Sequence, residues 1–199
     1  AILHYLDITQ HTRISHITSI SRIDEERYVR LDRFTVRNLE LVQSLGEDGK
    51  SLLDVIDRTV SPMGARLLRR WLLFPLKDVT AINARLDIVE YFFRDTEMRD
   101  ELARQLSVVG DLERLISKVA VGRISPREVV QLRNSASAIE PVRRLCMESD
   151  LPALHTIGEQ LNPCRGMIDR ISAEIVDDAP AALNRGAVVR SGVDAELDE

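Results

Sequence analysis

Residues 51–76, SLLDVIDRTVSPMGARLLRRWLLFPL, contain a helix whose two ends are both marked by local sequence signals. Ser61 carries a hydroxyl that can accept a hydrogen bond from an unpaired backbone N–H, and Pro62 suits the first helical position, where its missing N–H costs nothing. Pro75 closes the segment, because the residue before a proline is pushed out of the α region. The sequence therefore predicts a helix between Ser61 and Pro75.

The apolar residues of this helix recur at helical spacing and predict one buried stripe, formed by Leu67, Leu68, Trp71 and Leu72. Trp71 is the largest of them, and we expect it to anchor a core. Gly64 sits in the first turn, where glycine costs about 1 kcal/mol relative to alanine. Close approach of a neighbouring backbone is the expected reason for it.

The other side of the same helix carries Arg66, Arg69 and Arg70. Contact with nucleic acid is one interpretation of these arginines. A solvated or salt-bridged helix face is the favoured interpretation, because no aromatic residues are interleaved for base stacking. We therefore keep the three arginines only as weak DNA-proximal candidates.

Composition predicts a mainly α fold, a multi-helix bundle with one or two short extended segments. The chain has 199 residues, 4% aromatic residues, nine Gly and seven Pro, which is few for a loop-rich or all-β protein. Further helix starts are expected at Asp32, Ser51, Asp78 or Thr80, Asp111 and the Ser125–Glu128 capping box, with a kink at Pro141. The extended segments are expected at 14–23 and 186–193, and a new acidic helix from Asp194.

Charge and cysteine content narrow the function classes. Residues 173–199 hold seven acidic residues and two arginines, and so account for the entire net charge of −5. Tight nucleic-acid binding by this chain alone is disfavoured, because such affinity comes mainly from phosphate neutralisation. Cys146 and Cys164, without a signal peptide, fit free thiols in a reducing cytoplasm, and no apolar run approaches a membrane span. Both ends are expected to be cuts in a longer protein.

Three sequence patterns suggest a nucleotide-binding, metal-binding or catalytic site, but each is better explained without such a site. The segment 44–51 resembles a P-loop but has serine where its first glycine should be, so a polar turn is expected. Cys146, His155 and Cys164 lack a fourth ligand and the tighter spacing of zinc sites, so no metal site is predicted. No nucleophile or paired carboxylate accompanies the remaining histidines, which are His4, His11 and His16. No catalytic residue and no cofactor-binding residue is predicted.

The central stretch resembles the core region of the MutS family of DNA mismatch repair proteins. The resemblance rests on the pattern T-x-x-x-M-G-x-R-x-L-x-x-W-L-x-x-P-L, formed by Thr59, Met63, Gly64, Arg66, Leu68, Trp71, Leu72, Pro75 and Leu76. Flanking matches are Leu31-Asp32, 37–41, Ile82, Arg85-Leu86-Asp87, Val89-Glu90, Asp111-Leu112-Glu113-Arg114, Gly122-Arg123 and 192–199. The resemblance covers most of the chain and is weakest from about 140 to 182.

The resemblance implies a division of the chain. Residues 1–32 would be the end of a connector region and an entry segment, and 33–185 a helical core domain. Residues 186–199 would be an exit strand and the root of a lever helix that leads to a clamp domain. In the family these long helices join the clamp that closes over DNA to the ATPase domain.

The resemblance also implies which ligands and activities belong to the intact parent protein. Mismatched duplex DNA, ATP and Mg²⁺ would be bound by an intact, cytoplasmic parent protein, expected to be a homodimer and a DNA-dependent ATPase. None of the four phenylalanines starts the family's mismatch-reading Phe-x-Glu motif, and the P-loop is incomplete. We therefore expect a non-enzymatic core and lever element. The alternatives are a helical protein–protein scaffold unrelated to repair and a small helical enzyme that uses a histidine.

Overall fold

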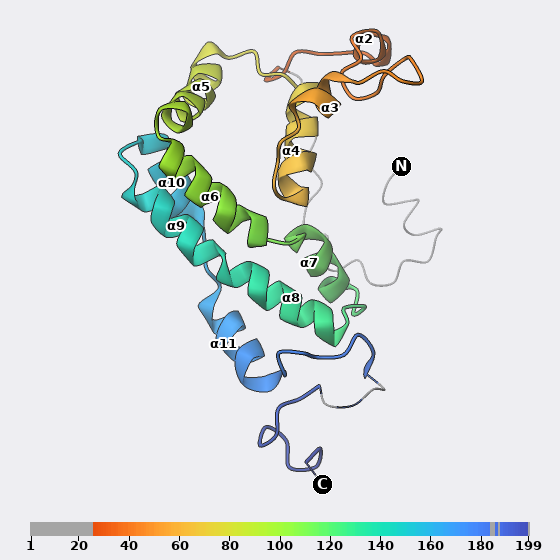
Figure 1. Cartoon of the computed structure of the whole chain (residues 1–199), viewed down its shortest axis with the longest axis vertical. Coiled ribbons are helices and arrows are strands. Elements are labelled where there is room, and N and C mark those ends of the chain that lie inside the picture. Colours follow the sequence, from red (N-terminus) through yellow and green to blue (C-terminus); the bar gives the residue numbers. More distant parts are fainter. Residues whose placement is uncertain (1–25, 184–185, 187, 199) are drawn as a thin grey trace.

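The computed structural model describes residues 26–183, 186 and 188–198, and helices make up most of this part (Figure 1). In chain order the N-terminal half contains α2 (Arg33–Asn38), α3 (Leu52–Ile56), α4 (Pro62–Leu73), α5 (Val79–Arg94) and α6 (Thr96–Val108). The C-terminal half contains α7 (Leu112–Ala120), α8 (Pro126–Ser137), α9 (Ile139–Glu148), α10 (Pro152–Gln160) and α11 (Arg165–Glu174). The mainly α fold class is confirmed.

The helices begin where local capping signals predict. Ser61 Oγ accepts a hydrogen bond from Gly64 N at 3.2 Å, with Pro62 at the first helical position. Ser125 and Glu128 form the expected capping box, in which each side chain bonds the backbone N–H of the other residue. Asp32, Ser51, Asp78 and Asp111 cap α2, α3, α5 and α7, each with a side-chain oxygen that accepts a backbone N–H, and Ser51 also forms a capping box with Asp54. The expected helix starts are therefore confirmed.

Two helix ends follow from backbone chemistry. α7 ends in a Schellman motif, where Gly122 at φ +66° allows Arg123 N to bond Lys118 O at 2.8 Å. α8 and α9 are separated at Ala138, three residues before Pro141. Pro141 has no N–H for the Ser137 carbonyl one turn back, and its ring crowds that carbonyl. The helix that was expected to kink at Pro141 is interrupted at Ala138.

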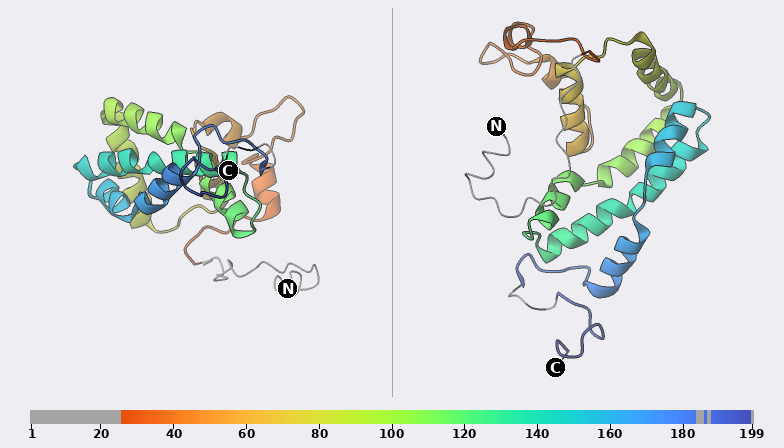
Figure 2. Two further views of the ribbon diagram at one scale, coloured as in Figure 1. Left: turned by 90° about the horizontal axis from the view of Figure 1, so that it is seen from below. Right: turned by 180° about the vertical axis from the view of Figure 1, so that it is seen from behind.

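The core lies in the C-terminal half of the chain. α8 and α9 follow one another, α6 and α10 pack against α9, and α7 and α11 pack against α8 (Figure 2). The buried apolar residues of the described part all lie between 109 and 179, namely Val109, Leu115, Val130, Leu132, Ala136, Ala138, Val142, Cys146, Leu154 and Ala179. In residues 26–108 the one buried residue is Ser51.

The prediction that Trp71 is a buried core anchor is wrong. Trp71 is 41% exposed and its neighbour Leu67 is 46% exposed, because the described part of the chain leaves that side of α4 uncovered. The guanidinium carbon of Arg85 lies 3.7 Å from the centroid of the Trp71 ring, a cation–π contact. Trp71 therefore joins α4 to α5 at the surface.

The reason expected for Gly64 is also corrected. A Cβ added there would meet the Ser61 hydroxyl at 3.1 Å and the Thr59 Cβ at 3.4 Å. Both contacts come from side chains that precede α4, so the tight space belongs to the cap of the helix rather than to a neighbouring backbone.

The segment that precedes α2 pairs with the segment that follows α4. Tyr28 and Leu76 form an isolated antiparallel bridge, and Val29 N donates a hydrogen bond to Pro75 O at 2.7 Å. The rings of Tyr28 and Phe74 meet edge to face with centroids 6.0 Å apart. The predicted extended segment 14–23 and His4, His11 and His16 lie outside the described residues.

The C-terminal segment is extended where expected but does not start a helix. Val189 forms an antiparallel bridge with Ile175, which confirms the extended character of the described part of 186–193. Asp194 instead opens a turn, in which Leu197 N bonds Asp194 O at 3.2 Å and Gly192 N bonds the Asp198 carboxylate at 2.6 Å. Residues 194–198 form a turn, and the lever root stays a prediction together with the domain boundaries.

Candidate functional site: a junction between α4 and α7

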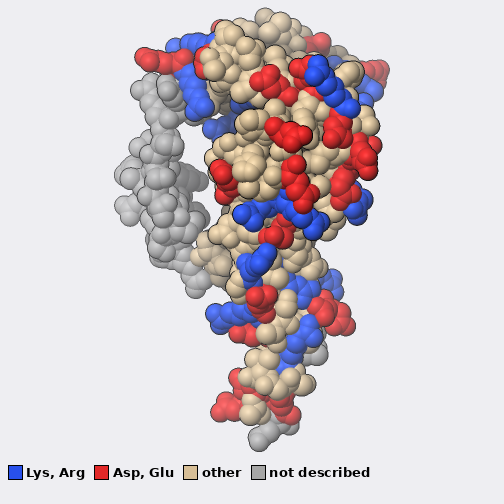
Figure 3. Space-filling model, turned by 90° about the vertical axis from the view of Figure 1, so that its left-hand side faces the viewer, with Lys and Arg blue, Asp and Glu red and all other residues tan. Residues whose placement is uncertain are grey.

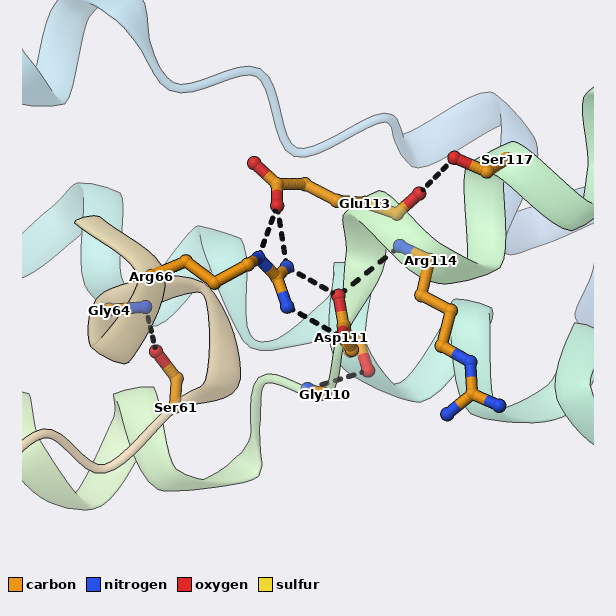
Figure 4. Close-up of polar contacts among 9 residues, drawn as sticks. Ser61, Gly64, Arg66, Gly110, Asp111, Glu113, Arg114 and Ser117 are labelled. Atoms are coloured by element: carbon orange, nitrogen blue, oxygen red, sulfur yellow. Dashed lines mark hydrogen bonds and ion pairs between the residues drawn. The ribbon is translucent and has the colours of Figure 1, made fainter. Parts of the chain in front are cut away.

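Arg66 joins α4 to the start of α7 through two carboxylates (Figure 4). Its Nη1 and Nη2 atoms donate to the two carboxylate oxygens of Asp111 at 2.9 and 2.7 Å. Its Nε atom donates to Glu113 Oε2 at 2.9 Å, and Nη2 also reaches that oxygen. A guanidinium matches this geometry because its donors lie in one plane and can bond a carboxylate through two parallel hydrogen bonds.

Asp111 has two roles in this junction. It is the N-cap of α7, and its Oδ1 atom accepts a hydrogen bond from Arg114 N at 3.2 Å. The hydrogen bonds from Arg66 are the main cause of a lowered pKa for the Asp111 carboxyl, and the Arg114 N–H contributes further. The same hydrogen bonds raise the pKa of Arg66. The helix start and the interhelical contact therefore depend on one ionised carboxylate.

The junction brings together two stretches that are 45 residues apart in the sequence. Arg66 belongs to the M-G-x-R part of the central pattern, and Asp111 and Glu113 belong to the D-L-E-R stretch. The favoured interpretation of a salt-bridged helix face is confirmed for Arg66. Arg69 and Arg70 are exposed, and the described part of the chain contains no ion pair for either.

The other residues of the central pattern position α4. Thr59 donates from its backbone and its hydroxyl to Asp57 Oδ1 at 2.9 and 2.7 Å, which shapes the turn before the helix. The Pro75 carbonyl accepts a hydrogen bond from Val29 N. Met63, Leu68 and Leu72 are partly buried residues of α4. The pattern thus contributes the turn before α4, the end of α4 and the contacts of α4 with α5 and α7.

Asp111 and Glu113 were recognised in the sequence as family matches, but they were not predicted to be partners of Arg66. The available signal was charge, since the arginine-rich helix face contains no acid of its own and the D-L-E-R stretch supplies two. Arg66 and Asp111 are 45 residues apart, so they can pair only if α4 lies against α7. Capping residues and apolar spacing within one helix do not specify how two helices are placed.

A second set of ion pairs connects α7, α8 and the segment that follows α11. Lys118 in the last turn of α7 pairs with Glu128 in the capping box of α8. This contact and the Ser125 N–H lower the pKa of Glu128 to about 2. Asp177 accepts from Arg133 at 2.6 Å and from Arg190 at 2.8 Å, which holds the C-terminal segment against α8.

The segments suspected of binding a nucleotide or a metal have other structures. Residues 44–51 form the expected polar turn, in which Gly49 N bonds Gly46 O at 3.2 Å. Ser51 Oγ bonds Asp54 Oδ2 at 2.7 Å, and Glu47 and Asp48 are exposed, so these residues do not fit a phosphate group.

The residues suspected of metal binding are dispersed. Cys146 is buried, Cys164 is exposed, and His155 lies 3.6 Å from Glu159. Across residues 26–183, 186 and 188–198, no group of three or more His, Cys, Asp and Glu is arranged to hold a metal ion. None of the helices described is long and apolar enough to cross a membrane.

Fold and junction together define a helical domain whose sequence motifs serve to connect helices. The profile of the family described as MutS domain III matches residues 34–198, most of the chain, and the chain therefore belongs to this family. The resemblance expected from the central pattern is confirmed, and the unrelated scaffold is set aside.

Curated relatives agree with this membership. The chain is 60% identical over all 199 residues to the DNA mismatch repair protein MutS of Parabacteroides distasonis and 59% identical to that of Bacteroides thetaiotaomicron. It is 56% identical to the same protein of Porphyromonas gingivalis. Each match covers 100% of this chain but only 22–23% of the relative. The chain thus spans about a quarter of the length of the relatives that it matches.

Proposed function

We propose that this chain is the core and lever element of a DNA mismatch repair protein, and that it couples DNA binding to nucleotide binding. The relatives are named DNA mismatch repair proteins and extend far beyond the matched segment. In this proposal a clamp domain contacts mismatched duplex DNA, an ATPase domain binds ATP and Mg²⁺, and a connector domain precedes the core. The longer protein would be a cytoplasmic homodimer and a DNA-dependent ATPase.

The observation that carries the proposal is the Arg66 junction. A domain that transmits a displacement must keep its helices in a constant relative position, because slack between them would absorb the movement. Arg66 connects α4 to α7 through four hydrogen bonds to Asp111 and Glu113, and Lys118 connects α7 onward to α8. These contacts form a continuous path of charged links from α4 to the buried core.

The test uses the longer protein with Arg66→Gln, and Arg114→Gln as its matched control. Arg114 is an exposed arginine next to Glu113, but it contacts Asp111 only through its backbone N–H. Nucleotide affinity is measured with and without mismatched duplex. Coupling free energies are typically about 1–3 kcal/mol, or about 5- to 150-fold in affinity. We expect this DNA-dependent change to shrink severalfold in Arg66→Gln and to persist in Arg114→Gln.

Reciprocity supplies a second measurement of the same quantity. Coupling is thermodynamically symmetric, so nucleotide should alter DNA affinity less in Arg66→Gln by the same factor. Circular dichroism of both variants establishes that the helices are intact. If folded Arg66→Gln shows wild-type coupling in both directions, the junction is a passive spacer and the proposal is wrong.

We propose a weak DNA-proximal role for Arg69 and Arg70, without Arg66, because the guanidinium of Arg66 is already engaged. Exposed arginines bind phosphates and release counterions, so each contact contributes about 0.9 to the slope of log affinity against log salt. Replacing both with Gln should lower the slope by about 2 if each contacts one phosphate. Affinity of the longer protein for duplex DNA, measured across a salt series, decides this. An unchanged slope shows that the pair is merely solvated.

A further inference from the structure

Ser135 in α8 places a polar side chain inside the core, where it is 1% exposed. Its Oγ atom accepts a hydrogen bond from Gly110 N at 3.0 Å. Two other helix serines, Ser117 and Ser137, instead donate to carbonyl groups four residues back in their own helices. Charged side chains are spread over the surface, as the face in Figure 3 shows. Ser135 is therefore an internal polar link between α8 and another part of the chain.

The turn that Ser135 holds leads directly into the Arg66 junction. Gly110 lies between Val109, the C-cap of α6, and Asp111, the N-cap of α7 (Figure 4). The Asp111 carboxylate receives both terminal nitrogens of Arg66. A displacement of Gly110 would therefore displace the carboxylate that Arg66 binds.

Gly110 lies directly against one face of α8. A Cβ added to Gly110 would lie 2.9 Å from Ser135 Oγ and 3.4 Å from Gln131 Nε2. Ser135 and Gln131 are four residues apart and so share a face of the helix. Close approach to that face explains the glycine, and the position of the turn follows from the position of α8.

The junction benefits from such an anchor because its charged groups are partly exposed. The side chains of Arg66, Asp111 and Glu113 are 48, 24 and 67% exposed. Ion pairs between exposed side chains contribute little when both side chains must be ordered to form them. A carboxylate on a backbone that is already fixed loses less conformational freedom on pairing, so a fixed turn at Asp111 favours the contact with Arg66.

The other end of α7 is held independently of Ser135. Lys118 in its last turn pairs with Glu128 at the start of α8, and Leu115 between the two ends is 4% exposed. α7 thus has a polar contact with α8 near each end. Loss of the Ser135 contact should therefore free the start of α7 while its last turn stays in place.

We propose that Ser135 is a positioning residue of the Arg66 junction, because its buried hydroxyl holds the Gly110 turn and thereby places the Asp111 carboxylate for Arg66. Without the hydroxyl, the Gly110 N–H loses its partner in a partly buried place, which is costly. The turn then moves to satisfy this N–H with water and carries Asp111 with it. This placement of Asp111 is independent of the proposed function, and only its effect on coupling rests on the proposed function.

The test is hydrogen exchange of α7 in the longer protein, measured by mass spectrometry. Ser135→Ala removes the hydroxyl and leaves a good helix former, and Ser137→Ala on the same helix is the matched control. The Arg114 and Leu115 amides bond to Asp111. We expect the peptide that contains them to exchange severalfold faster in Ser135→Ala and at the wild-type rate in Ser137→Ala. A wild-type rate in Ser135→Ala would overturn the proposal.

A combined variant distinguishes positioning of the junction from a separate contribution to packing. If Ser135 acts through the junction, Arg66→Gln should accelerate exchange of α7 in the wild-type background and have little further effect in Ser135→Ala, because both changes remove the same contact. Independent sites have additive free energies, so their effects on the exchange rate would multiply. Multiplied effects would also overturn the proposal.

Two further measurements keep the test decisive. If Ser135→Ala does not fold, Ser135→Cys takes its place, since sulfur is a weaker acceptor on a side chain of similar shape, and the same direction is expected. The DNA-dependent change in nucleotide affinity should shrink severalfold in Ser135→Ala. If coupling is intact in both Ser135→Ala and Arg66→Gln while exchange responds as expected, the proposed function is wrong and the positioning role of Ser135 stands.

Discussion

α4 and α8 begin with the same local signal and have the same length, yet they occupy opposite environments. Each has 12 residues, a serine N-cap and a proline at its start. In α8 five residues are buried, namely Pro126, Val130, Leu132, Ser135 and Ala136. In α4, within the described part of the chain, no residue is buried. Capping chemistry therefore decides that a helix forms, while the neighbouring helices decide whether it becomes part of a core.

The two helices also differ in how they are held. α8 packs against α7, α9 and α11, so its position follows from apolar contact. α4 is held through polar links, namely the Arg66 junction with α7, the Arg85–Trp71 contact with α5 and the pairing beyond its C-terminus. Polar links specify a position while leaving the apolar side of a helix available to another partner.

The largest difference between the two helices should appear on shortening one leucine in each. Leu132→Ala in α8 removes a side chain that is 5% exposed, and the expected loss in free energy of unfolding is about 2–5 kcal/mol. Leu67→Ala in α4 starts from 46% exposure and should cost about 1 kcal/mol or less. Urea denaturation of the chain measures both. Equal losses would show that α4 is as well packed as α8.

A smaller effect should follow from adding one methyl group to a glycine. In Gly158→Ala the new Cβ would lie 2.9 Å from Met147 Sδ and 3.1 Å from Cys146 Cβ, so crowding between α9 and α10 should cost about 1–3 kcal/mol. In Gly166→Ala nothing lies within 4 Å, and better helix propensity should stabilise α11 by up to about 1 kcal/mol. Thermal denaturation distinguishes the signs. A stabilised Gly158→Ala variant would mean that the C-terminal core is loosely packed.

The smallest effect should appear in acid, at the ion pair between α7 and α8. The pKa of Glu128 is lowered from an ordinary value of 4.5 to about 2 by Lys118 and the Ser125 N–H. A carboxyl with a lowered pKa contributes stability above its unfolded-state pKa, and this contribution is lost as the pH falls through the folded-state value. Glu128→Gln should therefore lower Tm near pH 7 and flatten its decline between about pH 4.5 and 2.

Thermal denaturation across a pH series measures this effect. A decline of Tm in Glu128→Gln as steep as that of the wild type would show that the pair of Lys118 and Glu128 does not stabilise the folded chain.

Local signals predicted much of this fold because they act within a few residues. A serine hydroxyl, a proline ring or a glycine at positive φ acts on the backbone next to it, so the ends of α4, α7 and α8 could be predicted. Residues 194–198, where the sequence predicted the start of a helix, form a turn in which Leu197 N bonds Asp194 O.

The contacts of the α4–α7 junction were harder to predict from the sequence. Arg66 was identified as a pattern residue, but its partners Asp111 and Glu113 lie 45 and 47 residues away. The motif pairs that carry the family resemblance prove to be neighbours in space, as Arg66 and Asp111 show and as Trp71 and Arg85 show again. Charge complementarity hinted at the first pair, and no local signal indicated the second.

The amino-acid sequence by itself determined the helical class, most helix boundaries, the interruption before Pro141 and the family, because these depend on local backbone chemistry and residue pattern. Only the tertiary structure decided that the Trp71 side of α4 faces solvent, that Arg66 is engaged by α7, and that the buried Ser135 hydroxyl bonds Gly110. The physical reason is that burial and ion pairing depend on which helices meet, and the same amphipathic helix can turn its apolar face toward a neighbour inside or outside the chain.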